Sequence, residues 1–248
     1  KLMNIIEKLR KATFRGIKNF DMIGKWNKVL IAVSWWKDSL AALDILVHLQ
    51  KYSDLEFTLT ACYVVPEIPG ISNLTDELKK RFEDYWIDYI IQKLNIPEGS
   101  KLREWIDEAS TCQRCSYSRR IALFKIAEEQ GFDRIVYGHH MDDMVHTFLQ
   151  NVYLKKELKI MLPVNKMRKG DFWIIRPFVY VREEEIIRFC NRREIIPIES
   201  NCPLKDITNR TQMKNVLKNL EVQLPDFAQK LMLSYIAKLP DEIWYVWK

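Results

Sequence analysis

The stretch IAVSWWKDSL, residues 31–40, joins the end of an apolar run to the start of a segment with helical spacing. The run VLIAV at 29–33 predicts a buried parallel strand, and LAALDILVHL at 40–49 predicts a helix. A strand that turns sharply into a helix makes an anion site, because unpaired N–H groups and the positive helix end converge there. The turn carries four residues suited to binding phosphate, namely Ser34, Lys37, Asp38 and Ser39.

Two tryptophans, Trp35 and Trp36, occupy the turn itself. Glycine suits such a position, because without a Cβ the backbone can approach a phosphate closely. If the turn requires φ above zero, each tryptophan costs about 1 kcal/mol or more. Two interpretations stay open: the indoles point away and the amides still bind phosphate, or the turn is only a capped helix start.

The composition is that of a globular protein, with 48% hydrophobic and 29% charged residues in a chain of 248. No apolar run reaches the roughly 18 residues that a membrane span needs, and the first residues form a basic amphipathic pattern rather than a signal peptide. We therefore expect a cytoplasmic protein without a membrane partner. The formal charge of +6 favours a polyanionic partner, for which nucleic acid is the usual candidate.

Candidate strands alternate with helical segments along the chain. Strands are expected at 28–33, 56–65, 101–106, 133–138 and 172–176, and helices at 38–51, 74–94, 116–130, 141–156, 182–193 and 208–235. This alternation predicts a doubly wound α/β fold, a parallel sheet with helices on both faces and its ligand at the carboxyl ends of the strands. We expect a helical arm at 1–25, the main domain at 26–220 and a helical tail at 221–248.

Five cysteines and no secretory pattern argue for metal or redox chemistry rather than a disulfide framework. Cys112 and Cys115 form a C-x-x-C pair at the expected entrance to a helix, where the helix dipole and nearby arginines favour thiolate. Cys202 could complete a three-cysteine site with one open coordination position; the alternative is a two-cysteine redox pair. Cys62 and Cys190 lie within apolar elements, and we expect buried structural thiols there.

The stretch GHHMDDMVHTF at 138–148 follows the strand expected at 133–138. Gly138 is expected to permit the turn, and Asp142 and Asp143 stand where a helix begins. Two adjacent carboxylates near a phosphate site can position Mg²⁺ or orient a nucleotide. The alternative is charge complementing the helix dipole, worth about 0.3 to 1 kcal/mol. The histidines are more typical of hydrogen-bonding or capping groups than of ligands.

Together these clusters resemble the PP-loop ATP pyrophosphatase superfamily and, within it, the tRNA 2-thiocytidine synthetase family. The resemblance runs from about residue 27 to residue 220. It rests on an ordered series: S-x-x-K-D-S, C-x-x-C-S-x-x-R-R, G-H-H-x-D-D, I-R-P at Arg176, and Asn201-Cys202. The chain departs from the family at the turn, where members carry S-G-G-x-D-S.

The resemblance implies an ATP-dependent enzyme that adenylates the C2 oxygen of a pyrimidine in tRNA, with cytidine favoured, and then replaces AMP with sulfur. It implies ATP, Mg²⁺ and a [4Fe–4S] cluster as cofactors, and sulfide or a persulfide carrier as sulfur donor. Catalytic roles fall on Asp142, Asp143 and Lys37, and cluster ligation on Cys112, Cys115 and Cys202. ATP contacts are implied at Ser34, Lys37, Asp38, Ser39, Tyr63, Val64, Val65, Gly138 and His139.

RNA contacts are expected at basic residues of the arm and of the second cluster, namely Lys11, Arg15, Arg119 and Arg120. The apolar face of the arm, with Ile5 and Leu9, could pack against a second subunit, so a homodimer is one expected assembly. Alternatives are a 2-thiouridine-forming relative, a persulfide transferase without a cluster, and a non-catalytic RNA-binding or cluster-carrying protein with a degenerate turn.

Overall fold

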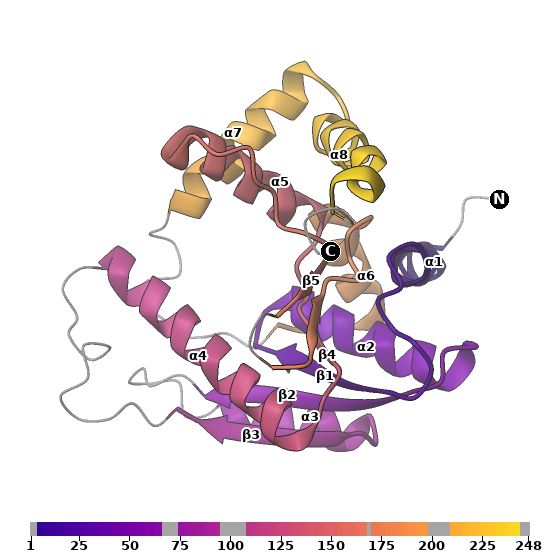
Figure 1. Ribbon diagram of the computed structural model, residues 1–248. Coiled ribbons are helices and arrows are strands. Elements are labelled where there is room, and N and C mark those ends of the chain that lie inside the picture. Colours follow the sequence, from indigo (N-terminus) through magenta and orange to yellow (C-terminus); the bar gives the residue numbers. More distant parts are fainter. Residues whose placement is uncertain (1–3, 66–73, 95–107, 168–169, 198–208, 244–248) are drawn as a thin grey trace.

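The computed structural model describes residues 4–65, 74–94, 108–167, 170–197 and 209–243 (Figure 1). Within these ranges the strands form one sheet in the order β3-β2-β1-β4-β6-β5, parallel except for β5 at one edge. The strands are β1 (Asn27–Val33), β2 (Phe57–Val65), β3 (Asp88–Lys93), β4 (Arg134–Val136), β5 (Val164–Lys166) and β6 (Trp173–Ile175). The predicted α/β fold with a mostly parallel sheet is confirmed.

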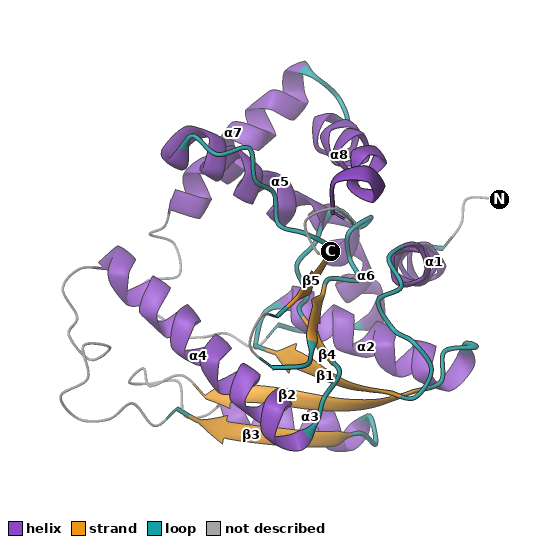
Figure 2. Ribbon diagram, viewed as in Figure 1, coloured by secondary structure: helices purple, strands orange, loops and turns teal. Residues whose placement is uncertain are grey.

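Helices lie on both faces of the sheet (Figure 2). Packing follows the two-residue period of a strand: Val29, Ile31 and Val33 enter the larger core, and Leu30 enters the smaller core beneath α4. The α-helices are α1 (Ile5–Asn19), α2 (Lys37–Tyr52), α3 (Leu74–Asp84), α4 (Glu108–Gln130), α5 (Met141–Gln150), α6 (Glu183–Arg193), α7 (Asn209–Gln223) and α8 (Phe227–Ile243), and the π-helix η2 (Asn151–Lys155) continues α5. No helix in the described ranges is both long and apolar enough to cross a bilayer.

Helix α1 is the helix expected in the N-terminal arm, and it packs against α6 and α2 of its own chain. Leu9 and Ile17 on its apolar face are buried in the larger core, with Ile5 packed beside them. The face that the sequence offered to a second subunit is therefore used within the chain.

The prediction of one helix over 74–94 is confirmed for the first half of this segment and wrong for the second half. Helix α3 ends at Asp84, and the chain continues as β3, which pairs with β2. Trp86 has a left-handed φ of 54°, which stops a helix, and the β-branched pair Ile90 and Ile91 favours a strand. Strand β5 was not predicted, because three residues are too few to show a period. The strand expected at 101–106 lies outside the described residues.

Two further helix boundaries differ from prediction. Helix α4 begins at Glu108 instead of residue 116, since 108–115 contains no glycine or proline that would stop it. The helix expected over 208–235 is divided into α7 and α8, with Pro225 and Asp226 between them. Pro225 has no N–H to continue the ladder, and Asp226 has a left-handed φ of 62°.

Gly138 lies directly beyond β4, against the first turn of α2. A Cβ at this position would stand 2.8 Å from the Asp38 carbonyl oxygen and 2.9 Å from the Ser39 nitrogen. Gly138 does not have a left-handed φ, so conformational freedom is not what requires glycine at this position. Glycine is needed here because the end of β4 approaches the start of α2 so closely.

We predict that Gly138→Ala lowers the free energy of unfolding by about 1 to 3 kcal/mol, because backbone atoms of α2 must move to admit the methyl group. Urea denaturation of the full chain measures this change. The matched control is Gly24→Ala, where the nearest atom to the new Cβ would be Asn27 Oδ1 at 3.4 Å. Equal stability of the two variants would contradict the close-approach explanation.

Candidate active site

The turn between β1 and α2 is held by one hydroxyl. Ser39 Oγ accepts from the Ser34 N–H at 2.9 Å, lies 2.9 Å from Ser34 Oγ, and is 3.0 Å from the Ser34 carbonyl oxygen. The first hydrogen bond of α2 runs from Leu40 N–H to the Trp36 carbonyl. The preceding N–H groups of α2 are thus not used by the helix, as a phosphate-binding turn requires.

The two tryptophans fit the turn without a left-handed backbone. Neither is among the residues with positive φ. Trp36 is the N-cap of α2 and has an extended backbone, with φ −80° and ψ 145°. The Trp35 indole is buried against the Tyr63 ring in an edge-on contact, with centroids 6.3 Å apart, whereas Trp36 is half exposed. The strain considered for these residues is absent, and the Trp35 side chain extends into the core.

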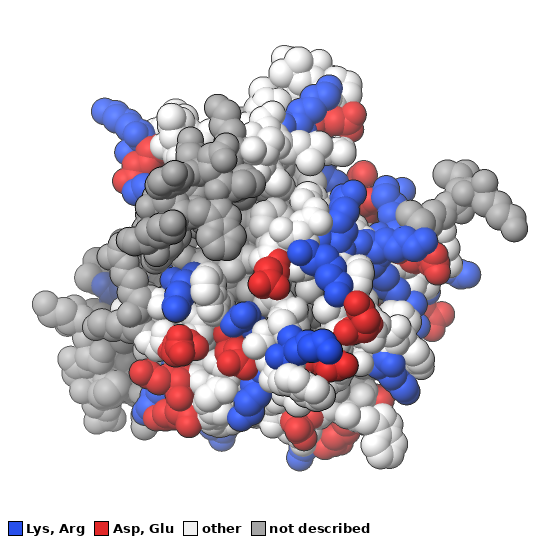
Figure 3. All heavy atoms as spheres, turned by 45° about the vertical axis from the view of Figure 1, so that its right-hand side comes forward, with Lys and Arg blue, Asp and Glu red and all other residues white. Residues whose placement is uncertain are grey.

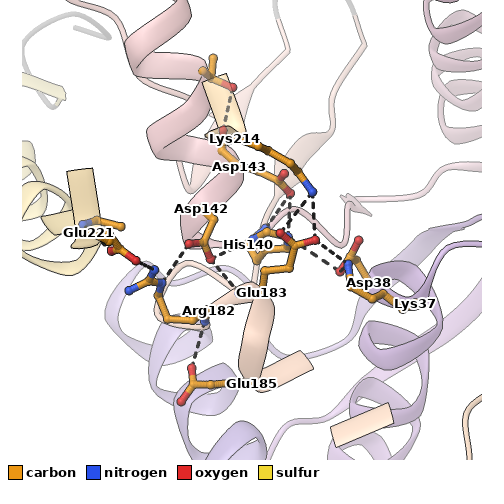
Figure 4. A network of polar contacts seen from close by, with 12 residues as sticks. Lys37, Asp38, His140, Asp142, Asp143, Arg182, Glu183, Glu185, Lys214 and Glu221 are labelled. Carbon is orange, nitrogen blue, oxygen red and sulfur yellow. Dashed lines mark hydrogen bonds and ion pairs between the residues drawn. The ribbon is translucent and has the colours of Figure 1, made fainter. Parts of the chain in front are cut away.

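Lys37 lies in a set of paired charges that joins the turn to α6 and α7 (Figure 4). Its Nζ is 2.9 Å from both Asp38 Oδ1 and Glu183 Oε1. Lys214 of α7 also reaches Glu183, at 3.0 Å. Burial opposes ionisation of Glu183, but its bonds to Lys37 and Lys214 outweigh burial and lower its pKa to about 2. The pKa of Lys37 is raised for the same reason, since Asp38 and Glu183 overcome the effect of burial.

Asp142 holds the start of α6. Its Oδ1 accepts from Arg182 Nε at 2.9 Å and its Oδ2 from the Glu183 N–H at 2.7 Å. Arg182 in turn donates to Glu221 of α7 at 2.6 Å. Burial raises the pKa of Asp142, but the hydrogen bond and charge of His140, with the charge of Arg182, lower it to about 2. Both carboxylate oxygens are therefore engaged, and Asp142 stays ionised at neutral pH.

His140 stands at the centre of the carboxylates. Its side chain is buried, with Nε2 3.5 Å from Asp143 Oδ2 and 3.8 Å from Asp38 Oδ1. Burial opposes protonation, but Asp143, Asp142 and Asp38 raise its pKa. Asp143 also accepts from the His140 N–H at 3.2 Å and caps α5. In the described part of the chain, no three His, Cys, Asp or Glu side chains are grouped so that they could hold a metal ion.

The cysteines lie differently from the prediction. Because α4 begins at Glu108, Cys112 and Cys115 lie inside the helix and not at its entrance, so the helix dipole does not act on them as expected. Cys115 is a partly exposed free thiol. The side chain of Cys112, and all of Cys202, lie outside what the structure describes. Cys62 and Cys190 are buried as predicted, and burial raises their pKa values to about 12 and about 11.

The proposed adenine contacts lie at the end of β2. Val64 and Val65 pair with β3 on one side, at Gln92 and Lys93. On the other side β1 ends at Val33, opposite Tyr63, so its pairing with β2 does not reach the two valines. His139, which follows Gly138, is half-buried with its ring 5.5 Å from the Tyr137 ring.

The basic residues expected to contact RNA lie on two different helices. On α1, Lys11 pairs with Glu7 at 3.4 Å, and the Arg15 guanidinium lies 4.4 Å over the Tyr180 ring. Figure 3 shows lysine and arginine side chains gathered on the side where α1 lies, with acidic residues among them. On α4, Arg119 lies 5.8 Å over the Trp35 ring, and Arg120 is exposed one residue later.

Sequence reasoning missed four partners of this site, which are Arg182, Glu183, Lys214 and Glu221. The signal for two of them was present, because Arg182 and Glu183 begin a predicted helix with an acidic first turn. Their role could not be read there, since an acidic first turn is ordinary for any helix. The capping role expected of the histidines is confirmed for His140, which is the N-cap of α5.

Comparison with known proteins gives a consistent result. A family model described as "PP-loop domain" matches residues 7–220. A tRNA-cytidine(32) 2-sulfurtransferase of Marinobacter nauticus is 34% identical over 231 residues, which is 90% of this chain and 74% of that protein. One of the same name from Alcanivorax borkumensis is 35% identical over 252 residues, covering 98% and 85% respectively.

Solved structures share the fold. The U34-tRNA thiolase NcsA from Methanococcus maripaludis, solved with its [4Fe–4S] cluster, has a TM-score of 0.79 at 24% identity over 96% of this chain and 79% of that one. An NH₃-dependent NAD synthetase from Campylobacter jejuni has a TM-score of 0.51 at 17% identity, covering 98% and 94%.

We predict that Asp142→Asn removes part of the acid dependence of stability. The carboxyl has a pKa of about 2 in the folded chain against 3.8 ordinarily, so its stabilisation is complete above pH 4 and is lost as the pH falls towards 2. The variant should be less stable at pH 7 by on the order of 2 kcal/mol, with a flatter stability profile between pH 4 and 2. Urea titrations at several pH values measure both effects.

The control for this prediction is Asp171→Asn, whose side chain is 98% exposed. It should follow the parent chain at every pH. A profile for Asp142→Asn that stays parallel to the parent between pH 4 and 2 would exclude the assigned pairing.

Proposed function

The chain belongs to the PP-loop family and, within it, to the tRNA-cytidine(32) 2-sulfurtransferases, and on this premise we propose that it catalyses ATP-dependent thiolation of a cytidine in tRNA. One observation carries the proposal: the phosphate turn, the carboxylates of α5 and the cysteine-bearing α4 meet at the carboxyl edge of one sheet. His140 lies within 3.8 Å of Asp38, and Arg119 of α4 lies over Trp35 of the turn. Such an edge is where α/β sheets bind ligands.

ATP is proposed to bind with its phosphates at the turn of Ser34, Lys37 and Ser39 and its adenine near Val64 and Val65. Lys37 is protonated at neutral pH, because its pKa is raised, and can neutralise the charge of the leaving pyrophosphate. Mg²⁺ is proposed to arrive with the nucleotide, whose phosphates and water would supply most of its ligands. Asp143 is the proposed contact from the protein.

The reaction needs the nucleotide beside the base. The C2 oxygen of the pyrimidine attacks the α-phosphorus, pyrophosphate leaves, and sulfur then displaces AMP from C2. Asp142 is not available as a base, because both of its oxygens are bonded. We assign it a positioning role: it fixes Arg182 and the start of α6, and so the place of Glu183 beside Lys37.

Two cysteines of α4 support an iron–sulfur cluster in this chain. Cys112 and Cys115 both belong to this helix, three positions apart. Cys115 is free and partly exposed. We propose that these two with Cys202 hold the [4Fe–4S] cluster; when bound, a cluster with three thiolate ligands leaves one iron open to carry sulfur. The sulfur donor would be sulfide or a persulfide carrier.

We predict that Glu183→Gln tightens ATP binding about fivefold, because Lys37 loses one of its two carboxylate partners and the site loses a negative charge. Lys37→Ala should weaken binding about tenfold or more. Isothermal titration calorimetry with Mg²⁺ and ATP measures both. The matched control is Glu184→Gln on the same helix, where the side chain is 72% exposed and pairs with Arg188 instead.

Failure of the parent chain to bind ATP in that experiment would favour a non-catalytic RNA-binding protein with a degenerate turn. Binding restored by Trp35→Gly together with Trp36→Gly would place the defect in the indoles.

We predict that anaerobic reconstitution with iron, sulfide, ATP and unmodified tRNA yields 2-thiocytidine on nucleoside analysis. Cys115→Ser should lose both the bound iron and the product, because a ligand is removed. Cys62→Ala is the control, since this thiol is buried in the smaller core, and it should keep its iron. Full iron content in Cys115→Ser would rule out the proposed ligand set.

A further inference from the structure

Several buried polar atoms near the carboxyl ends of the strands have no hydrogen-bond partner among the described residues, and each can donate. Four belong to or follow strands, namely Trp35 Nε1, Tyr63 OH, Tyr137 OH and Arg176 Nε, and a fifth, Ser118 Oγ, belongs to α4. Buried donors are nearly always paired in folded proteins, because an unpaired one loses its hydrogen bonds to water without replacement. Such a collection is therefore the sign of a ligand rich in acceptors.

Tyr137 and Arg176 are neighbours on adjacent strand ends. Strand β4 pairs with β6 through Val136 and Ile175, and the Tyr137 N–H donates to the Ile175 carbonyl at 3.0 Å. One residue further on, Tyr137 and Arg176 continue the face that carries Ile135 and packs under α4. The two side chains thus reach the same side of the sheet as the buried face of α4.

The guanidinium of Arg176 is fixed at one end only. Its Nη1 donates to the Leu162 carbonyl at 2.6 Å, while Nε on the opposite edge is buried without a partner. That edge is the one with which arginine binds an oxyanion through two parallel N–H groups. The bond to Leu162 holds the edge in place before any ligand arrives.

Positive charge gathers around Tyr137. Burial raises the pKa of its phenol to about 12, with Arg120, Arg176 and Arg119 acting in the opposite direction. For Arg176 the direction is opposite, because burial disfavours the charged guanidinium. Burial and the charge of Arg120 lower the pKa of Arg176 to about 10, although Tyr137 and Asp143 act to raise it. The buried Tyr137 hydroxyl therefore lies in the electrostatic field of three guanidiniums. Asp143 is the carboxylate whose charge acts on Arg176. This excess favours an anion.

We propose that Tyr137 and Arg176, with Arg119 and Arg120 of α4, form a second anion site that binds a phosphate group of the RNA beside the target nucleotide. The choice of RNA rests on the proposed function: the turn at Lys37 takes the phosphates of ATP, so a separate set of donors serves a separate phosphate. Trp35 belongs to both sites, because its ring lies beneath Arg119. In this way the tryptophan in the turn positions a residue of the second site.

The test compares tRNA binding by the full chain and its variants, using fluorescence anisotropy over a series of salt concentrations. Tyr137→Phe should weaken binding about tenfold, the effect of losing one hydrogen bond to a charged acceptor, with no change in salt dependence. Arg176→Gln should weaken binding and also flatten the plot of log K against log salt by about 0.7, the contribution of one phosphate in single-stranded RNA.

Tyr85→Phe is the matched control, because the Tyr85 hydroxyl has a partner, Asp44 Oδ1, at 2.9 Å. This variant should lose thermal stability and keep full tRNA affinity. Tyr137→Phe should keep its thermal stability and lose tRNA affinity, because its hydroxyl has no partner among the described residues. Since Arg176→Gln also breaks the bond to Leu162, Tyr137→Phe keeps the test valid if the arginine variant does not fold.

Parent-like tRNA affinity in Tyr137→Phe, with parent-like binding of inorganic pyrophosphate in calorimetry, would overturn the proposal. Loss of pyrophosphate binding alone would support the anion site and assign it to the nucleotide instead of RNA. Thiolation of tRNA by the parent chain is measured in a separate experiment, by nucleoside analysis. A parent that binds tRNA without thiolating it would refute the proposed function and leave the site standing.

Discussion

Charge buried at the meeting point of three helices has to be compensated, and this requirement organises the molecule. Asp38, Asp142, Asp143 and Glu183 approach one another where α2, α5 and α6 begin. Unpaired, these carboxylates would repel and would each cost several kcal/mol to bury. Lys37, His140, Arg182 and Lys214 supply the matching positive groups. Helix α7 is held to the sheet domain by this pairing as well as by apolar contacts.

The turn between β1 and α2, which we propose to bind phosphate, shows how bulky residues can be accommodated at such a position. What such a turn requires is free N–H groups and room for the ligand, and glycine is one way to provide both. Here the backbone keeps negative φ, Ser39 fixes the loop, and Trp35 turns its ring into the core against Tyr63. The indole then packs beneath Arg119, a contact that glycine could not make.

The sheet could be predicted from sequence because its central strands are apolar runs bounded by turns, as in VLIAV at 29–33. Its edges could not: β5 has three residues, and β3 follows α3 after a tryptophan whose left-handed φ no period reveals. Within the site, the turn and Asp142 were found by motif, but their partners come from α6 and α7. Pairing across such distances depends on tertiary packing, which no local pattern records.

The sharing of Lys37 between two carboxylates bears on which anion the turn can accept. Its Nζ already has two anionic partners at 2.9 Å, so an entering anion must compete with Asp38 and Glu183 for the same charge. A polyphosphate carries more charge and more acceptor oxygens than a monophosphate and is the stronger competitor. The internal pairing would therefore act as a filter that ranks anions by their charge.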